Sequence, residues 1–277
     1  EWARTFQSES EKAFSIIWAI ASDSDARVVV GGTFAGSGLT MDSNEQDDRD
    51  ADALDSTNSA ADVFVAKFTK DGALSWQRSA GGEQRDELRA IAISPTDGEV
   101  FVTGGFYGKA TFGKTTLDTT DATAENAFVA SYDKDGRLRW ATQSDGPVAK
   151  QGAIGLSLAV DSNGGAVVVG WFRDTIAGFG GSSHELKSSG AHDVFIVRFN
   201  PGKSTVDWAI TAGTGSDEAG ITGVSIIPAK KDVKQSLVLC GYFVGSATFG
   251  LGEANETTLS GNGTYDACVV KFTPDGK

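Results

Sequence analysis

Four copies of one short pattern run through this chain of 277 residues. Each copy is a run of apolar and small residues that contains a glycine and ends in phenylalanine. The runs are VVVGGTF at 28–34, VFVTGGF at 100–106, AVVVGWF at 166–172 and LVLCGYF at 237–243. Aligned on the last phenylalanine, they share a glycine column formed by Gly32, Gly104, Gly170 and Gly241. A repeat of this kind predicts one supersecondary unit built several times, with neighbouring units burying a shared core.

A second run follows each of the first, and a tight turn comes after it. These runs are DVFVAKF at 62–68, NAFVASY at 126–132, DVFIVRF at 193–199 and DACVVKF at 266–272. Tryptophan follows three of the turns and also opens the chain, at Trp2, Trp76, Trp140 and Trp208, with spacings of 74, 64 and 68 residues. We therefore expect a single repeat domain at 1–277 with units at about 2–75, 76–139, 140–207 and 208–277.

The residues that recur in every unit are predicted to be structural. One tryptophan per unit at one strand position favours packing between neighbouring sheets, where each ring buries a large apolar area. Ligand stacking is the alternative. We expect the shared glycines, in the same way, to let neighbouring sheets nest. The polar residue that opens each second run is predicted to bond local backbone groups rather than a metal. It is Asp62, Asn126, Asp193 or Asp266.

Each unit is predicted to form two antiparallel hairpins. The first joins the glycine-containing run to a strand with an apolar–small–apolar signature, through turns rich in Asp, Ser and Gly. The signatures are Trp18-Ala-Ile20, Ile91-Ala-Ile93, Leu158-Ala-Val160 and Val224-Ser-Ile226. The second hairpin joins the second run to the tryptophan strand, in two units through Asp-Gly, a favoured turn. Four strands per unit, repeated radially, predict an all-β fold, a β-propeller of four-stranded antiparallel blades with four units in this chain.

The strand at 2–6 has two predicted places. If the ring closes within this chain, the strand completes the last blade and ties the two termini together. If the units are consecutive blades of a longer polypeptide or filament, it completes a neighbour's blade and hides an edge that would otherwise invite pairing.

These motifs resemble the bacterial β-propeller repeat called SBBP, which is known from seven-bladed propellers. The likeness lies in NAFVASY, KDGRLRW, AGGEQRDELRAIAIS and EVFVTGGFYG of the second unit and in their counterparts elsewhere. It implies the propeller fold and an extracellular or cell-surface location. It implies no catalytic residue, because the family shares none. The acidic insertion in the first unit and the cysteines in the fourth depart from the family pattern.

Charge and hydropathy exclude several classes of partner. With 24 Lys and Arg against 37 Asp and Glu, the net charge is −13. Nucleic acid is therefore not an expected partner, because phosphate binding requires clustered positive charge. Membrane insertion is not expected either, because no apolar run reaches the 18 or so residues that span a bilayer.

The segment 42–55 is the one strongly non-repetitive stretch, and it is acidic. Asp48, Asp50 and Asp52 have the alternate spacing of a calcium loop. Ala53 and Ser59 stand where an EF-hand needs Gly and Glu, so that motif is rejected. A looser calcium site and a solvated acidic loop remain as alternatives, and calcium is the only cofactor that the sequence suggests.

Two covalent features are also predicted as alternatives. Cys240 and Cys268 form either a disulfide or two buried thiols, because free cysteine packs as a small hydrophobe. Asn255 and Asn262 open sequons for N-glycosylation, although about one sequon is expected by chance in a chain of this composition.

No catalytic or phosphate-binding motif is present in the sequence. We therefore expect a non-enzymatic extracellular module that acts as a structural or adhesive subunit, in a filament or surface assembly. Its partners would be copies of itself, neighbouring repeat modules, or glycans. A carbohydrate-binding propeller is the alternative, followed by a polysaccharide hydrolase or lyase that uses paired carboxylates.

Overall fold

The computed structural model of the protein describes 1–7, 13–41, 54–57, 60–119, 121–145, 152–176, 178–182, 184–188, 192–212, 219–231 and 234–276. Within these ranges the chain forms strands and turns and no α-helix. No described segment forms a helix of the length and apolarity that crossing a bilayer requires. The fold is therefore all-β, as the sequence predicts.

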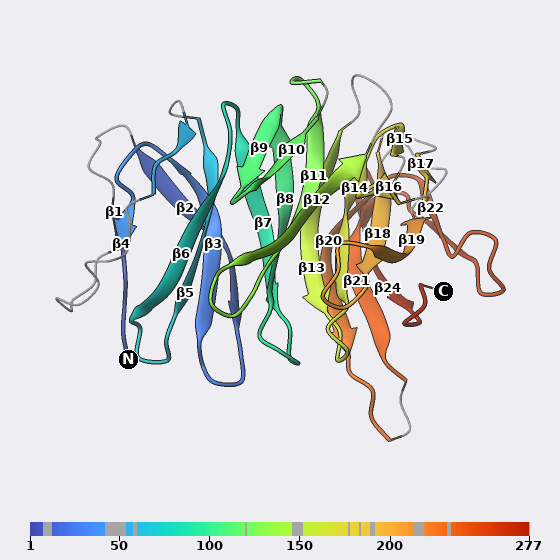
Figure 1. Cartoon of the computed structure of the whole chain (residues 1–277). Helices are drawn as coiled ribbons and strands as arrows, with labels where there is room; N and C mark the ends of the chain where they lie inside the picture. The colour runs from blue at the N-terminus through green and yellow to red at the C-terminus, as the bar shows by residue number, and fades with distance from the viewer. Residues whose placement is uncertain are drawn as a thin grey trace.

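Four main antiparallel sheets follow one another along the chain (Figure 1). Sheet 1 contains β2 (Phe14–Ser22), β3 (Val28–Ala35), β5 (Asp62–Phe68) and β6 (Leu74–Gly81). Sheet 2 contains β7 (Asp86–Ile93), β8 (Val100–Tyr107), β11 (Glu125–Tyr132) and β12 (Leu138–Asp145). Sheet 3 contains β13 (Ala153–Val160), β14 (Ala166–Phe172), β18 (Asp193–Phe199) and β19 (Val206–Ala212). Sheet 4 contains β20 (Ala219–Ile227), β21 (Ser236–Phe243) and β24 (Asp266–Phe272).

Shorter strands accompany these sheets. They are β1 (Phe6–Gln7), β4 (Thr40–Met41), β9 (Lys109–Phe112), β10 (Thr115–Asp118), β15 (Thr175–Ile176), β16 (Gly178–Phe179), β17 (Leu186–Lys187), β22 (Ser246–Phe249) and β23 (Thr257–Ser260). Of these, β1 with β4, β15 with β17, and β22 with β23 form separate two-stranded sheets. Two of the shorter strands join neighbouring repeats through the main chain, because β9 pairs with β6 and β16 pairs with β12.

The hydrophobic core lies between consecutive sheets. Val63 and Val65 of sheet 1 share a cluster with Leu88, Phe106 and Phe128 of sheet 2. The side of each sheet that faces the next one is called its forward face below. Residues at the same two positions of the second run form the forward faces of the following sheets, and they are Ala127 with Val129 and Val194 with Ile196.

One β-bulge recurs in the first hairpin of every main sheet, and it explains the glycine column. The register shifts between Ile17 and Ala19 in sheet 1 and between Leu88 and Ala90 in sheet 2, and it shifts at the equivalent place in sheets 3 and 4. A Cβ atom at the column glycines would overlap a carbonyl oxygen on the neighbouring strand of the same sheet. Those carbonyls belong to Ile16, Glu87, Ile154 and Gly220. The glycines therefore accommodate a bulge inside each sheet, and the expected nesting between sheets is not their main role.

The same register corrects the alignment of the first unit. Ile20 pairs with Val30 in sheet 1, just as Ile91 pairs with Val102 in sheet 2, so Ile20 is the equivalent of Ile91. Trp18 is the extra residue of the bulge, as Arg89 is in sheet 2. The signature Trp18-Ala-Ile20 is thus two residues out of phase, because the bulge rather than the apolar–small–apolar pattern sets the register.

The column tryptophans lie against the turn of the following sheet. Trp76 of sheet 1 packs 6.1 Å from the ring of Tyr132 in sheet 2, and its indole Nε1 donates to Lys134 O at 3.1 Å. A Cβ at Gly136, which has φ +77°, would lie 2.6 Å from the Trp76 ring. Trp2 makes the same contacts with sheet 1, stacking on Phe68 and donating to Lys70 O at 3.2 Å.

The third and fourth sheets keep a weaker form of this contact. Trp140 lies 5.6 Å from the ring of Phe199, but nothing lies within 4 Å of a Cβ at the turn glycine Gly202. The indole nitrogens of Trp140 and Trp208 have no hydrogen-bond partner among the described residues. The longer turn of sheet 3, which contains Pro201, moves its glycine away from the ring.

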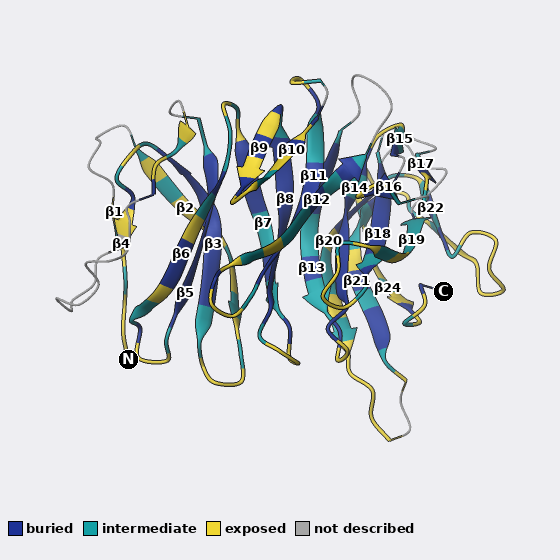
Figure 2. Cartoon of the chain, viewed as in Figure 1, coloured by how far each residue is buried: buried dark blue, intermediate teal, exposed yellow. Residues whose placement is uncertain are grey.

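Burial differs between the middle and the ends of the array (Figure 2). Every described residue of β5 and of β8 except Tyr107 is buried. By contrast, Ile20 of β2 is 70% exposed and Val269 of β24 is 73% exposed. The N-terminus lies beside sheet 1 and the C-terminus beside sheet 4, at opposite sides of the molecule in Figure 1. Phe6 pairs with Met41, so the strand at 2–6 does not complete sheet 4 in this structure.

Candidate functional site

A polar cleft lies where the first-hairpin turns of sheets 1 and 2 meet. Its volume is about 390 Å³, and its lining includes Asp23, Asp25, Arg27, Asp97 and Lys134. Asp and Ser fold such turns because their side chains bond backbone amides a few residues on. Accordingly, Asp23 Oδ1 accepts hydrogen bonds from the amides of Asp25 and Arg27, both at 3.0 Å.

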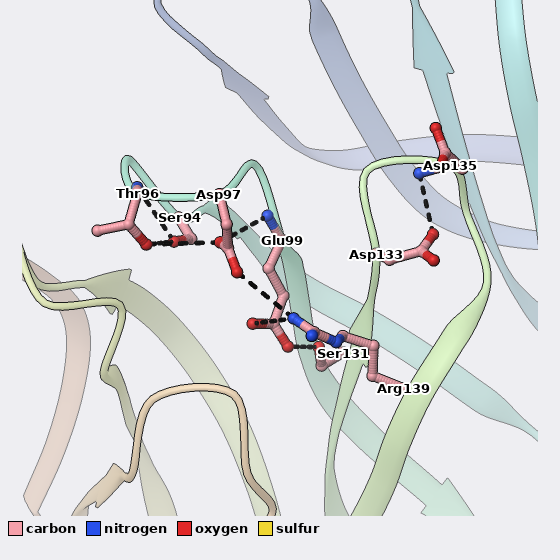
Figure 3. Close-up of polar contacts among 8 residues, drawn as sticks. All are labelled: Ser94, Thr96, Asp97, Glu99, Ser131, Asp133, Asp135 and Arg139. Atoms are coloured by element: carbon pink, nitrogen blue, oxygen red, sulfur yellow. Dashed lines mark hydrogen bonds and ion pairs between the residues drawn. The ribbon is translucent and has the colours of Figure 1, made fainter.

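The sheet 2 side of this cleft is held by a buried carboxylate (Figure 3). Glu99 is 2% exposed, and one of its oxygens accepts a hydrogen bond from the Ser131 hydroxyl. Its other oxygen lies 3.1 Å from Arg139 Nη1, and the same nitrogen lies 3.4 Å from Asp97 Oδ2. One guanidinium nitrogen therefore bridges two carboxylates that come from a single turn.

The remaining polar groups at this end are also engaged within the turns (Figure 3). Ser94 Oγ lies 2.8 Å from Thr96 Oγ1, and Asp133 Oδ1 accepts the amide of Asp135 at 2.9 Å. Burial alone raises the pKa of Asp97, but hydrogen bonds from Ser94 and the Glu99 amide, with the charge of Arg139, bring that pKa below its usual value. The carboxylate is thus a stable anion that closes a turn.

Sheet 3 repeats this acid–guanidinium device. Asp161 Oδ1 accepts the amides of Asn163 and Gly165, and its Oδ2 receives Arg198 Nε at 2.9 Å. Arg198 Nη1 also lies 2.5 Å from Asp207 Oδ2. The pairing holds the first-hairpin turn to the fourth strand in sheet 2, through Arg139 of β12, and to the third strand in sheet 3, through Arg198 of β18. Because an acid–guanidinium pair recurs in two sheets, it is explained by the fold without a ligand.

Lys67 is the exception beside this cleft. It occupies the position of Arg198, since it pairs with Val29 as Arg198 pairs with Val167. The side chain is 2% exposed, and no described residue accepts a hydrogen bond from its Nζ. Burial, followed by the charge of Arg27, lowers the pKa of the Lys67 amine. In sheet 1 the carboxylate of Asp23 pairs with Arg27 at 2.7 Å, so Lys67 does not have the acidic partner that Arg198 has in Asp161.

A second polar group lies at the opposite end of the sheet 1–sheet 2 junction. Asp62 and Asp86 are 3% and 1% exposed, and a Cβ at Gly81 would contact both carboxylates. Burial raises the pKa of Asp62 to about 6. Burial and the charge of Asp62 raise the pKa of Asp86 to about 8. Such a pair retains a proton near neutral pH, because two buried carboxylates this close do not both ionise readily.

The surroundings of this pair are mainly backbone. Asp62 Oδ2 accepts the amide of Thr57 at 2.9 Å, and Asp86 Oδ2 accepts the amide of Gly82 at 2.8 Å. The second oxygen of each carboxylate has no hydrogen-bond partner in the described part of the chain. A neighbouring surface cleft of about 980 Å³ is lined by Thr57, Gly81 and Gly82. Paired acids beside a cleft could transfer protons, but no third His, Cys, Asp or Glu among the described residues joins them as a metal site.

Two other polar residues of the same column bond local groups, the alternative to a metal role. Asn126 Nδ2 donates to Ser144 O at 3.0 Å, and Asp266 Oδ2 accepts the amide of Gly263 at 3.0 Å. In the described ranges no three or more His, Cys, Asp or Glu side chains come together as a metal site. Asp48, Asp50 and Asp52 lie outside the described residues, so the calcium hypothesis stays a prediction.

The two cysteines are free thiols, and the disulfide alternative is wrong for this structure. Gly241 pairs with Cys268 and Cys240 pairs with Val269, so the cysteines are one residue out of register on adjacent strands. Their side chains therefore point to opposite faces of sheet 4. Cys268 is buried and Cys240 is exposed, so the expectation of two buried thiols holds only for Cys268.

Asn255 and Asn262 lie in exposed loops of the fourth unit. Asn255 precedes β23, where Thr257 Oγ1 donates to Asn255 O at 3.1 Å, and Asn262 lies between β23 and β24. Their exposure permits glycan attachment, and the modification itself stays a prediction.

Several buried polar residues of these sites were not singled out from the sequence, among them Asp86, Lys67 and Glu99. Asp86 was detectable, because the equivalent positions of sheets 3 and 4 carry Ala153 and Ala219. Lys67 and Glu99 gave a weaker signal, since Lys and Glu are common on exposed strand edges. Only the strand pairing shows that these two residues are buried inside the molecule.

Comparison with known proteins gives one distant relative and no matching family model. An uncharacterized WD repeat-containing protein of Acanthamoeba polyphaga mimivirus is 24% identical over 193 residues, which is 65% of this chain. The chain spans 13% of the length of that relative. This similarity suggests a repeat protein of the β-propeller type. Because no family model matches the chain, the resemblance to SBBP repeats has no support from this comparison.

Proposed function

We propose that this chain is a non-enzymatic module of consecutive β-propeller blades, related to SBBP repeats, that serves as a structural or adhesive subunit outside the cell or at its surface. Sheets 1 to 4 are the four blades of the predicted units. The observation that carries the proposal is the repeated junction: Trp2 meets the turn of sheet 1 as Trp76 meets the turn of sheet 2. A repeated junction of this kind supports a role as a scaffold.

The polar residues support the same role. The carboxylates in the cleft of Figure 3 are bonded to turn amides and to Arg139, so they are not available as acid–base groups. The similarity to a WD repeat-containing protein agrees with a scaffold. Extracellular location rests on the resemblance to SBBP units.

Immunogold labelling tests the location and the structural role together. Antibodies against this chain should label intact source cells at a density close to that of permeabilised cells. Label that enters only after permeabilisation would contradict the surface role.

Glycan binding and hydrolysis test the two rival functions. A glycan array should give no saturable binding, and incubation with a polysaccharide panel should release no reducing ends. Hydrolysis that disappears in Asp62→Asn or Asp86→Asn, with folding retained, would replace the scaffold by an enzyme.

A further inference from the structure

Lys67 lies in the junction between sheets 1 and 2. Val63 and Val65 precede it on β5 and belong to the core cluster that sheet 1 shares with sheet 2. Alternate residues of a strand face the same side, so Lys67 continues the forward face of sheet 1. Its cross-strand partner is Trp76, whose indole donates to the turn of sheet 2 at Lys134 O. With 2% exposure, the Lys67 side chain is enclosed between the two sheets.

The junction provides no acid for this buried amine. Arg198, at the equivalent position of sheet 3, is bonded to Asp161 at 2.9 Å. Asp23 is the equivalent of Asp161, because each accepts two amides of its own turn through Oδ1. Asp23 is, however, paired with Arg27 at 2.7 Å, and no described residue accepts a hydrogen bond from Lys67 Nζ. A buried ammonium without an acceptor is costly, so the neutral amine is favoured.

One residue accounts for the difference between sheets 1 and 3. Arg27 stands where sheet 3 has Gly165, since the amides of both residues donate to the turn aspartate. A Cβ at Gly165 would contact the guanidinium of Arg198 and would lie 2.8 Å from Asp161 Oδ2. Glycine therefore leaves the aspartate to the third strand in sheet 3. In sheet 1 the side chain of Arg27 takes the aspartate instead.

The charges around Lys67 come from both sheets. Arg27 and Asp23 belong to the first-hairpin turn of sheet 1, and Lys134 and Asp135 belong to the second-hairpin turn of sheet 2. Burial and then the charge of Arg27 lower the pKa of the Lys67 amine, and Lys134 adds to this effect. Asp23 and Asp135 act in the opposite direction without reversing it. A lysine amine kept neutral in this way is a nucleophile, and its enclosure restricts the reagent to a small uncharged molecule.

We propose that Lys67 is a modification site at which carbon dioxide forms a reversible carbamate. The lone pair of Nζ forms a bond to the carbon of CO2, and one C=O electron pair moves onto oxygen. One proton then leaves the nitrogen for the solvent, so no oxidant, reductant or further reactant is needed. The carbamate carries one negative charge, which the cations Arg27 and Lys134 balance. Both line the polar cleft of about 390 Å³ beside Lys67, through which the reagent would enter.

The modification would strengthen the junction between sheets 1 and 2. The carbamate oxygens are acceptors, so they can receive hydrogen bonds from Arg27 of sheet 1 and Lys134 of sheet 2. A carboxylate paired with a guanidinium already holds the turns of sheets 2 and 3 in a similar way. We therefore expect CO2 to raise the melting temperature of the protein. The inference does not depend on the scaffold function, because it concerns the chemistry of one junction.

Trapping of the adduct tests the site directly. The protein is equilibrated with ¹³C-labelled bicarbonate, and the carbamate is ethylated with triethyloxonium and located by mass spectrometry of peptides. The ethyl carbamate should be on Lys67. Lys70, exposed and paired with Asp71 at 2.8 Å, is the internal control and should carry at least about tenfold less, the change in neutral amine that about one pKa unit gives. Lys67→Met should lose the carbamate resonance in ¹³C NMR, and Lys70→Met should keep it.

Arg27→Gly provides a test that keeps Lys67 in place. This variant reproduces the glycine of sheet 3 and releases Asp23, which should then pair with a protonated Lys67 as Asp161 pairs with Arg198. We expect the trapped fraction at Lys67 to fall at least about tenfold. An unchanged fraction would contradict the proposed site.

Phosphate separates the covalent adduct from a bound anion. Bicarbonate should raise the melting temperature of the parent chain but not that of Lys67→Met, and phosphate at the same ionic strength should raise neither. An equal rise with phosphate, without a trapped adduct, would replace the carbamate by an anion-binding site. Equal labelling of Lys67 and Lys70 in the parent chain, or no label on Lys67, would overturn the proposal whether or not the variants fold.

Discussion

At the scale of single residues, Gly32 and Gly104 each lie under a carbonyl oxygen of their own sheet, which a Cβ atom would overlap. A bulge cannot be read from composition, because the extra residue is Trp18 in sheet 1 and Arg89 in sheet 2. The glycine recurs because the bulge recurs, although the extra residue of the bulge differs between sheets.

Gly104→Ala should therefore destabilise the protein by about 1–3 kcal/mol, the usual cost of forcing extra volume into a packed site. The added methyl group would overlap Glu87 O. Gly263→Ala is the control, because its nearest neighbour would lie at an ordinary 3.4 Å. Urea denaturation measures both variants. Equal midpoints would show that the bulge carbonyl moves aside freely.

The buried pair Asp62–Asp86 makes stability depend on pH. Both pKa values are raised in the folded protein, to about 6 and about 8, from about 4 in the unfolded chain. The folded state then binds more protons, so the free energy of unfolding falls as pH rises from about 4 to about 8.

Asp86→Asn should remove most of this dependence while keeping an acceptor for the Gly82 amide. At pH 8 we expect the free energy of unfolding of the variant to exceed that of the parent by at least about 1 kcal/mol, since one pKa unit corresponds to about 1.4 kcal/mol. At pH 5 the difference should shrink. Thermal denaturation at the two pH values measures it, and a gap that widens towards acid would refute the assignment.

At the scale of strands and turns, the hairpins and their turn residues were predictable because Asp-Gly turns and apolar runs act locally. The junctions were predictable only in outline. Every unit has a tryptophan, but whether its indole donates to a carbonyl depends on how the next turn is placed against the ring. Trp76 does find one at Lys134, whereas Trp140 faces the longer turn at Pro201 and has no such partner among the described residues.

Two turn glycines isolate this contact. Gly136 and Gly202 have φ values of +77° and +65°, so alanine at either position is strained in the same way. Only alanine at Gly136 would also contact the ring of Trp76. Gly136→Ala should cost at least about 1 kcal/mol more than Gly202→Ala, on the scale of a forced core contact. Chemical denaturation compares them, and equal losses would mean that the ring contributes nothing to the turn.

At the scale of the whole molecule, the all-β class with its antiparallel sheets was predictable from the sequence, whereas burial at the two ends was not. A β-branched residue such as Val269 looks the same in the sequence whether or not another sheet covers it. The isolation of the Asp62–Asp86 pair and of Lys67 also depends on neighbouring sheets, so these groups were not predictable from local patterns.

Hydrogen exchange should reveal this difference between middle and ends. In dilute solution we expect amides of β24 to exchange at least about tenfold faster than amides of β11, because local opening costs less where fewer apolar contacts form. Mass spectrometry of peptic fragments measures both strands in one sample. Equal exchange rates for the amides of β24 and β11 at every dilution would contradict the exposure of sheet 4.

The short ladders between outer hairpins also decide how the array would respond to tension. Backbone hydrogen bonds join β6 to β9 and β12 to β16. These bonds resist a pulling force at the junction between sheets 1 and 2 and at the junction between sheets 2 and 3. No such ladder joins β19 to the outer hairpin of sheet 4 in the described residues, and the backbone bond from Ala219 N to His192 O, at 3.2 Å, crosses the junction between sheets 3 and 4 without it. Stretched from its two termini, the molecule would rupture first at the junction between sheets 3 and 4.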